Sequence, residues 1–231
     1  MHESGSQHPR KGRRRLRRAL TAVSALLVVA GVGVIAYPFL TDVYTAQVRQ
    51  PDLEQDFQAL ERELDDSARQ PAYAAQAKDL APDDPLTRMV IPKLDVNTLV
   101  VAGTTAEALR AGAGHYPDTP LPGQEGNVGI AGHRTTYGKP LSHAEQLTVG
   151  DEVRLETPVA TYTYEVIPPP QDAPSACDQA ACWITRPDDW SVVEDLDGHY
   201  LTLTTCHPRG SDSQRLIVRA RLAETEKVAE R

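Results

Sequence analysis

A cysteine, a histidine and an arginine stand at the ends of predicted strands, and these three residue types can carry out nucleophilic chemistry. Cys206 closes the run YLTLTTC, in which strand alternation places Thr202, Thr204 and Cys206 on one face. Pro208 and Gly210 follow, so Cys206 lies where the strand opens onto a loop. A thiol at such a position is a candidate nucleophile, and the alternative is a buried structural cysteine.

Cationic partners for this thiol are present in the sequence. His133 follows a glycine at the end of the run GNVGIAG, although it is one of seven histidines. Arg215 opens the run QRLIV nine residues after Cys206, so a hairpin return would bring the two side chains together. The permanently charged guanidinium carries five donors and could stabilise a developing oxyanion. The alternative for Arg215 is an ordinary surface salt bridge.

The two other cysteines lie in a proline-rich segment, residues 168–190, which is long for an idle loop. Cys177 and Cys182 form a C-x4-C pattern, which in an extracellular domain predicts a small disulfide and leaves Cys206 unpaired. A metal site is the competing interpretation. A second loop, residues 112–126, contains His115 and Tyr116, which could line a cleft or pack within a turn.

The elements that must position these residues are short and β-rich. Seven runs separated by Gly, Pro and Asp have strand character, and short helices are plausible at 105–110 and 142–147. Seven or eight strands within one domain predict a closed barrel or a sandwich. The strand runs are RMVIPKL, NTLVVAG, GNVGIAG, DEVRLET, ATYTYEVI, YLTLTTC and QRLIVRARL.

The N-terminus has a topology signal. Residues 1–18 carry a net charge of +6, so the remaining residues of this chain of net charge −8 carry −14. A basic head on an acidic body argues against nucleic-acid binding. Residues 19–40 contain no formal charge and would span about 33 Å as a helix, enough for a bilayer core. We interpret them as an uncleaved anchor with the N-terminus in the cytoplasm; a cleaved signal peptide is the alternative.

Residues 41–86 predict a partly helical stalk and linker. Leu53, Phe57, Leu60 and Leu64 form a helical stripe, with Pro51 near the expected helix start and Pro71 near its end. Such a helix could be a spacer, pack on its own domain or bind a partner helix. A β domain over 87–222 and a charged tail over 223–231 follow.

Three motifs in this order resemble the sortases, the membrane-anchored cysteine transpeptidases of Gram-positive bacteria. TLTTC at 202–206 resembles the family's TLxTC signature, and IAGHRTTYG at 130–138 resembles its histidine motif. Arg215 resembles its essential arginine. The stretches GHYPDTPLPGQ and LTTCHPRGSDSQRLIV are most similar to class E sortases of actinobacteria. Class C enzymes usually add an aromatic lid motif and a C-terminal membrane segment, which this chain does not match.

The resemblance implies an all-β fold, an eight-stranded sortase-type barrel with short helices behind an N-terminal transmembrane helix and helical stalk. It implies that Cys206 attacks the Thr–Gly carbonyl of a sorting signal, that His133 is the general acid and base, and that Arg215 stabilises the oxyanion with backbone near Thr205. No cofactor or metal is expected. The residues expected at the signal-binding groove are Thr205, Thr204, Ala131, Tyr137, His115 and Tyr116.

The partners implied are secreted proteins with an LAxTG- or LPxTG-like signal and an amine on a lipid-linked peptidoglycan precursor. The expected location is the cell membrane, with a single span and the catalytic domain outside. A class C-like pilin polymerase, a secreted cysteine peptidase and a non-enzymatic envelope protein are the alternatives.

Overall fold

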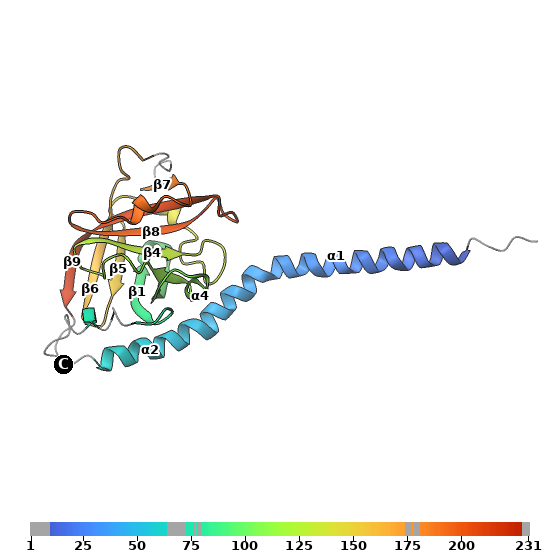
Figure 1. Cartoon of the computed structure of the whole chain (residues 1–231), viewed down its shortest axis with the longest axis horizontal. Helices are drawn as coiled ribbons and strands as arrows, with labels where there is room; N and C mark the ends of the chain where they lie inside the picture. Colours follow the sequence, from blue (N-terminus) through green and yellow to red (C-terminus); the bar gives the residue numbers. More distant parts are fainter. Residues whose placement is uncertain are drawn as a thin grey trace, which may run out of the picture. The chain divides into compact units, whose positions relative to one another are not determined.

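The computed structural model describes residues 10–63, 73–75, 77, 80–173, 177 and 181–227 (Figure 1), with side chains from residue 14. The chain divides into two compact units, Met1–Leu40 and Thr41–Arg231. Leu64 and Pro71 of the predicted stalk helix, and the last residues of the predicted tail, lie outside the described residues.

The described residues of the first unit are helical, and those after its basic cluster are mostly apolar. Helix α1 (Arg10–Tyr44) contains the whole uncharged run and continues past Pro38. Its large aliphatic side chains, such as Leu26, Val29 and Ile35, are exposed. Among the described residues, this N-terminal helical segment alone is long and apolar enough to cross a membrane.

The helical backbone does not stop before Pro51, where the sequence predicts a new helix start. A π-helix, η1 (Thr45–Arg49), follows α1 directly and leads into α2 (Gln50–Glu63). Pro51 has no amide hydrogen, so it cannot make the regular bond to the residue four positions earlier. The wider π turn just before it accommodates that missing bond.

Helix α2 packs on the β domain. Leu53, Phe57 and Leu60 are buried. Their cluster is completed by residues of β2 (Val96–Ala102) and of the region of α4 (Ala106–Leu109), namely Leu99, Val101, Ala108 and Ala111. Each such apolar side chain contributes about 1.5–3 kcal/mol when fully buried. The stalk helix therefore belongs to the same compact unit as the β domain, and packing on its own domain is the alternative that the structure shows.

The β domain is a closed barrel, as predicted. Eight strands pair in the order β6–β5–β1–β2–β3–β4–β8–β9, and β6 pairs again with β9 to close the ring. These strands are β1 (Pro85–Ile91), β2 (Val96–Ala102), β3 (Ala113–His115), β4 (Gly126–Gly132), β5 (Glu152–Glu156), β6 (Ala160–Val166), β8 (His199–His207) and β9 (Gln214–Lys227).

The barrel closes because β9 is long enough to pair with three other strands. Its first half pairs with β8 along one edge and with β7 (Cys182–Thr185) along the other. Its second half, from Ala220 to Lys227, pairs with β6. The first five residues of the predicted charged tail, 223–227, are thus part of the barrel, which extends the domain beyond residue 222. At the other end, β1 begins at Pro85 rather than at residue 87.

Two strands were missed in the sequence, and the predicted short helices are shorter in the structure. β3 (AGH) is short and has no β-branched residues, and it forms because β2 and β4 pair with it on its two sides.

The helix expected at 105–110 is α4 (Ala106–Leu109), capped by the Thr105 hydroxyl, which accepts a bond from the Ala108 amide. The one expected at 142–147 is a 3-10 helix, η3 (Ala144–Gln146). Two further 3-10 helices are η2 (Pro92–Leu94) and η4 (Trp190–Val193).

Alternation along three neighbouring strands sorts their side chains between the barrel core and its outer face. One set lies in the core, namely Val128 and Ile130 of β4, Leu201 and Leu203 of β8, and Leu216 and Val218 of β9. The residues between them therefore project to the outside of the barrel. There, Ile217 packs in a third apolar cluster with Trp183 and Val192.

Candidate active site

The three predicted reactive residues come from the ends of three adjacent strands. β4 runs parallel to β8 with Ala131 opposite Thr204. His133 and Cys206 each lie two residues further along, on the same outward side of their strands. On the other side of β8, Cys206 lies opposite Arg215 of antiparallel β9. The barrel thus brings together residues that are 82 positions apart in the sequence.

These three side chains line one cavity of about 230 Å³. Its floor is the outer face of the barrel, and its walls come from the loop after β3 and from the segment around η4. The other lining residues are Thr104, Leu109, Tyr116, Ala131, Gly132, Pro187, Asp189, Trp190, Val192, Val193, Thr204, Thr205 and Ile217.

Cys206 is a free, partly exposed thiol, whereas Arg215 is held by its own loop. The Arg215 Nη1 donates to the carbonyl oxygens of Asp212 and Gln214 at 2.9 and 3.0 Å. These two bonds use one guanidinium nitrogen, and the remaining donors of the planar group are available to the cavity. Arg215 thus brings a permanent positive charge to the cavity that Cys206 also lines.

His133 is partly buried beside an aromatic ring. Its imidazole and the Tyr137 ring have centroids 5.1 Å apart and are tilted by 37°. Its carbonyl accepts a bond from the Leu141 amide at 3.3 Å, which fixes the backbone at the end of β4. Burial lowers the pKa of His133 below its ordinary value, because a less solvated imidazolium is less stable.

A buried arginine missed in the sequence supports the backbone of the nucleophile. Arg134 is only 5% exposed, and its Nη1 donates to the Cys206 carbonyl at 3.1 Å and contacts His207 Nδ1 at 2.8 Å. Its Nη2 pairs with the Glu145 carboxylate at 3.0 Å, which also binds Arg209 at 3.2 Å. The network ties the ends of β4 and β8 to η3.

The predicted groove residues of β8 and of the loop after β3 are in contact. The Tyr116 and Thr204 hydroxyls are 2.9 Å apart, and the Tyr116 ring meets Trp190 edge-on at 6.4 Å. The buried Thr205 hydroxyl donates to the Gly132 carbonyl at 2.7 Å. Thr205 thus locks β8 to β4 through its side chain.

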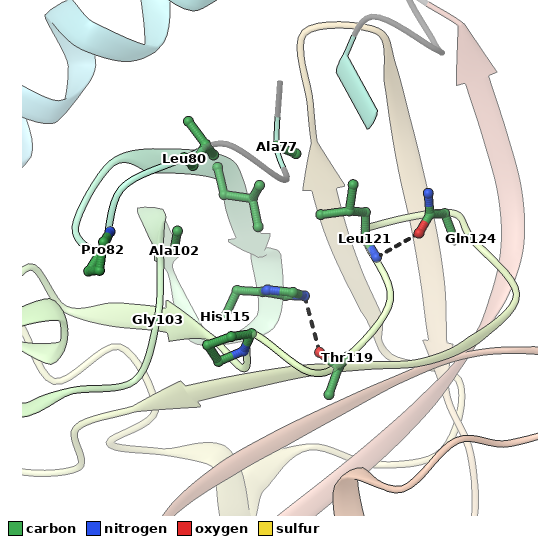
Figure 2. Close-up of a pocket in the computed structure, with 11 residues that line it drawn as sticks. Ala77, Leu80, Pro82, Ala102, Gly103, His115, Thr119, Leu121 and Gln124 are labelled. Carbon is green, nitrogen blue, oxygen red and sulfur yellow. Dashed lines mark hydrogen bonds between the residues drawn. The ribbon is translucent and has the colours of Figure 1, made fainter. Parts of the chain in front are cut away.

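Two predicted groove residues are not among those that line this cavity. Tyr137 packs on His133 instead. His115 is buried in a separate cavity of about 380 Å³, where its Nε2 lies 2.9 Å from the Pro120 carbonyl and 3.1 Å from the Thr119 hydroxyl. Figure 2 shows His115 pointing towards Thr119, with Leu80 and Leu121 on the walls. This packing explains His115 as a loop-organising residue.

Pro187, Asp189 and Trp190 form one wall of the cavity, and the sequence did not predict any of these three residues to lie at the site. The one available signal was the length of the proline-rich segment in which they lie. Asp189 accepts bonds from the hydroxyls of Thr185 and Ser191, which shape the turn into η4. This turn holds Trp190 at the rim of the cavity.

The sulfurs of Cys177 and Cys182 are bonded as a disulfide, so the pair is not a metal site. Cys182 is fully buried at the start of β7. In the described part of the chain, no group of three or more His, Cys, Asp or Glu side chains is arranged to hold a metal ion.

Comparison with known proteins shows the family to which the chain belongs. Residues 89–223, more than half of the chain, match the family model described as the sortase domain. The chain belongs to the sortase family. Sortases are cysteine transpeptidases, and the matched region runs from β1 to the second half of β9, which includes all three cavity residues singled out from the sequence.

Class E enzymes are among the relatives of this sortase. It is 30% identical over 149 residues to Sortase SrtE1 of Streptomyces coelicolor, a match that covers 58% of this chain and 39% of that protein. It is 31% identical over 139 residues to Sortase D of Bacillus subtilis, covering 58% of this chain and 62% of the relative. The chain thus spans less than two thirds of the length of either.

Solved structures agree with the fold. The structure of sortase E from Streptomyces avermitilis has 36% sequence identity and a TM-score of 0.54, over 64% of this chain and 93% of that one. A sortase D5 transpeptidase from Clostridium perfringens has 25% identity and a TM-score of 0.59, over 74% of this chain and 98% of that one.

Proposed function

We propose that this sortase cleaves a C-terminal sorting signal between Thr and Gly and transfers the protein to an amine of a lipid-linked peptidoglycan precursor. The observation that carries the proposal is the common cavity of Cys206, His133 and Arg215. A nucleophile, a proton carrier and a permanent cation in one partly buried site are the parts that acyl transfer needs.

The first half-reaction makes a thioester. The Cys206 thiolate attacks the threonine carbonyl carbon, and the electron pair moves onto the oxygen. Arg215 and backbone N–H groups near Thr205 stabilise that oxyanion. When the intermediate collapses, the C–N bond breaks and the His133 imidazolium gives its proton to the departing glycine amine.

The second half-reaction reverses these roles. The incoming amine attacks the thioester carbon, and neutral His133 accepts a proton from the nitrogen. The C–S bond breaks and returns the thiolate, so the chain ends with the same proton count as it began. Water in place of the amine gives hydrolysis, which is the peptidase outcome.

The signal would lie along the cavity next to β8. Ala131, Thr204 and Tyr116 line the cavity, and we assign them to the wall of the signal-binding groove. The bond between the Tyr116 and Thr204 hydroxyls gives this wall a fixed polar edge, beside the ring of Trp190. We assign Tyr137 to the support of His133, since the two rings pack together.

Two features of the chain support a location of the barrel outside the cell. The basic residues before the apolar helix favour a cytoplasmic N-terminus, with the barrel outside the cell. The Cys177–Cys182 disulfide supports that orientation, because disulfides persist in oxidising compartments. Both the exported substrate and a lipid-linked acceptor are found at that membrane surface.

The test is a transpeptidation assay with the full chain in detergent micelles. LAxTG and LPxTG peptides are incubated with the enzyme and triglycine, and the products are identified by mass spectrometry. We expect a peptide–triglycine product that Cys206→Ala abolishes and that a control, His199→Asn at an exposed position, retains. Hydrolysis without any amine product would favour the peptidase, and unchanged turnover in Cys206→Ala would refute the mechanism.

A further inference from the structure

The loop that carries His133 is held by the helical segment that precedes the barrel. The Asp42 carboxylate accepts a bond from the Gly138 amide at 3.1 Å and pairs with the Lys139 ammonium group. The neighbouring Thr41 hydroxyl accepts a bond from the Tyr137 amide at 3.4 Å. Three consecutive loop residues are therefore bonded to two residues of the last turn of α1.

This loop needs an external support. Tyr137, Gly138 and Lys139 all have positive φ, at 52°, 73° and 39°. Two of them are not glycine, and L-residues with side chains adopt this region only where the surroundings impose it. The hydrogen bonds to Thr41 and Asp42 stabilise this conformation. The strap also lies close to this loop, since a Cβ at Gly138 would be 3.2 Å from Thr45 Cγ2, tighter than most such contacts.

The support is itself anchored firmly on the barrel. The buried Thr45 hydroxyl donates to the Arg110 carbonyl at 3.0 Å. The Gln50 amide group bridges two segments, accepting from the Leu99 amide at 2.8 Å and donating to the Ala111 carbonyl at 2.7 Å. Residues 41–50 thus form a fixed strap across the barrel, and α2 continues it with its buried apolar face.

The strap reaches the candidate active site through one aromatic contact. Tyr137, whose amide is bonded to Thr41, packs its ring on the His133 imidazole. A shift of the loop would therefore move the ring that confines this imidazole. A displacement of about 1 Å in a proton donor can cost up to ~10²-fold in rate.

We propose that Asp42 is a positioning residue for the transpeptidation reaction, which sets the orientation of His133 through the loop 137–139. The inference rests on the proposed function, in which His133 protonates the leaving amine. It assigns to a residue outside the matched sortase domain a role in the proton-transfer step.

The chemistry provides a test that separates positioning from folding. An amide substrate needs a proton on its leaving nitrogen, whereas a thioester substrate releases a thiolate that needs none. The full chain in detergent micelles is given an LAxTG peptide and the matching peptide whose Thr–Gly amide is replaced by a thioglycolate thioester. Hydroxylamine is the acceptor in both assays, because it attacks a thioester without help from a base.

Four variants define the contact. Asp42→Ala removes both bonds, and Asp42→Asn keeps an oxygen for the Gly138 amide but loses the ion pair. Lys139→Met removes the ion pair alone. Asp56→Ala is the matched control, because Asp56 is an exposed carboxylate on α2, the helix that continues the strap. The rate of Cys206 alkylation by iodoacetamide reports in each case whether the cavity is intact.

We expect Asp42→Ala to lower kcat for the amide about tenfold, with KM and the thioester rate within twofold of the parent chain. Asp42→Asn should lie between the two, and Asp56→Ala should match the parent. His133→Ala should show the same selective loss on the amide, only larger. This shared pattern is the signature of one proton-transfer step.

The opposite results are equally distinct. If Asp42→Ala lowers the rates on the amide and on the thioester equally, Asp42 has only a structural role and the inference is overturned. If the alanine variant shows an abnormal rate of Cys206 alkylation, the same comparison is made with Asp42→Asn. A normal amide rate in both Asp42 variants, with His133→Ala inactive, would overturn it and leave the proposed function standing. Unchanged amide cleavage in His133→Ala would refute the proposed acid and the inference together.

Discussion

Cys206 and Arg215 lie opposite each other in the antiparallel pair of β8 and β9, one residue pair before the connecting loop. This register directs both side chains to the same face of the sheet, where they line one cavity. The strand pairing positions the cation, and the loop carbonyls of Asp212 and Gln214 hold its Nη1.

The first prediction concerns the shape of this cation. Arg215→Lys keeps the charge but loses the planar set of donors, so we expect kcat/KM for peptide cleavage to fall about 10²-fold. Arg221→Lys, at an exposed position of the same strand pair, is the matched control and should stay within twofold. Activity of Arg215→Lys equal to the control would remove Arg215 from the oxyanion site.

The second prediction concerns pH. Burial lowers the pKa of His133, so its imidazolium forms only below the ordinary range near ~6.5. In the proposed mechanism the Cys206–His133 pair reacts when it holds one proton. The rate should therefore rise with pH through an acid limb below pH ~6.5 and fall again as the pair loses its second proton. His199→Asn should leave both limbs in place.

The measurement is the rate of acylation of Cys206 between pH 5 and 10. A profile without two limbs in this range would contradict the coupled pair. An acid limb at a pH above the ordinary pKa of histidine would contradict the lowering of the His133 pKa by burial.

The third prediction concerns Arg134. Arg134→Met removes the bond to the Cys206 carbonyl and the ion pair with Glu145, at a position that is almost fully buried. We expect the free energy of unfolding to fall by roughly 1–3 kcal/mol in urea titrations followed by tryptophan fluorescence. The control, Arg186→Met, breaks the exposed ion pair with Asp188 and should change it by no more than the experimental error.

The fourth prediction concerns the disulfide. The native chain should contain one titratable thiol, because Cys177 and Cys182 are bonded and Cys206 is free. Replacing both bonded cysteines by serine should lower the free energy of unfolding by about 2 kcal/mol, the value for closing a loop of this length. Thiol titration and urea unfolding measure the two quantities, and three reactive thiols in the native chain would contradict the pairing.

Much of the fold could be predicted from the sequence, since local patterns are sufficient for it. Alternation and β-branched residues predicted seven strands, and all seven are present within the closed barrel. The short strand β3 could not be predicted, because its pairing partners and not its own composition make it a strand. The extra strand β7 contains the strand-favouring residues Trp183, Ile184 and Thr185, but it lies within the proline-rich segment that the sequence predicts as one long loop. Pro51 was misleading as a helix start, because a π turn allows the helical backbone to continue through it.

Residue types and their order along the chain determined the chemistry, and the tertiary structure decided the geometry. The sequence by itself selected Cys206, His133 and Arg215 from short motifs, and the lone free cysteine from the C-x4-C pattern. Only the fold could show that Arg134 supports the Cys206 backbone and that Asp42 holds the His133 loop. Those contacts join residues more than 70 positions apart, and only barrel closure and the packing of α2 determine which distant segments meet.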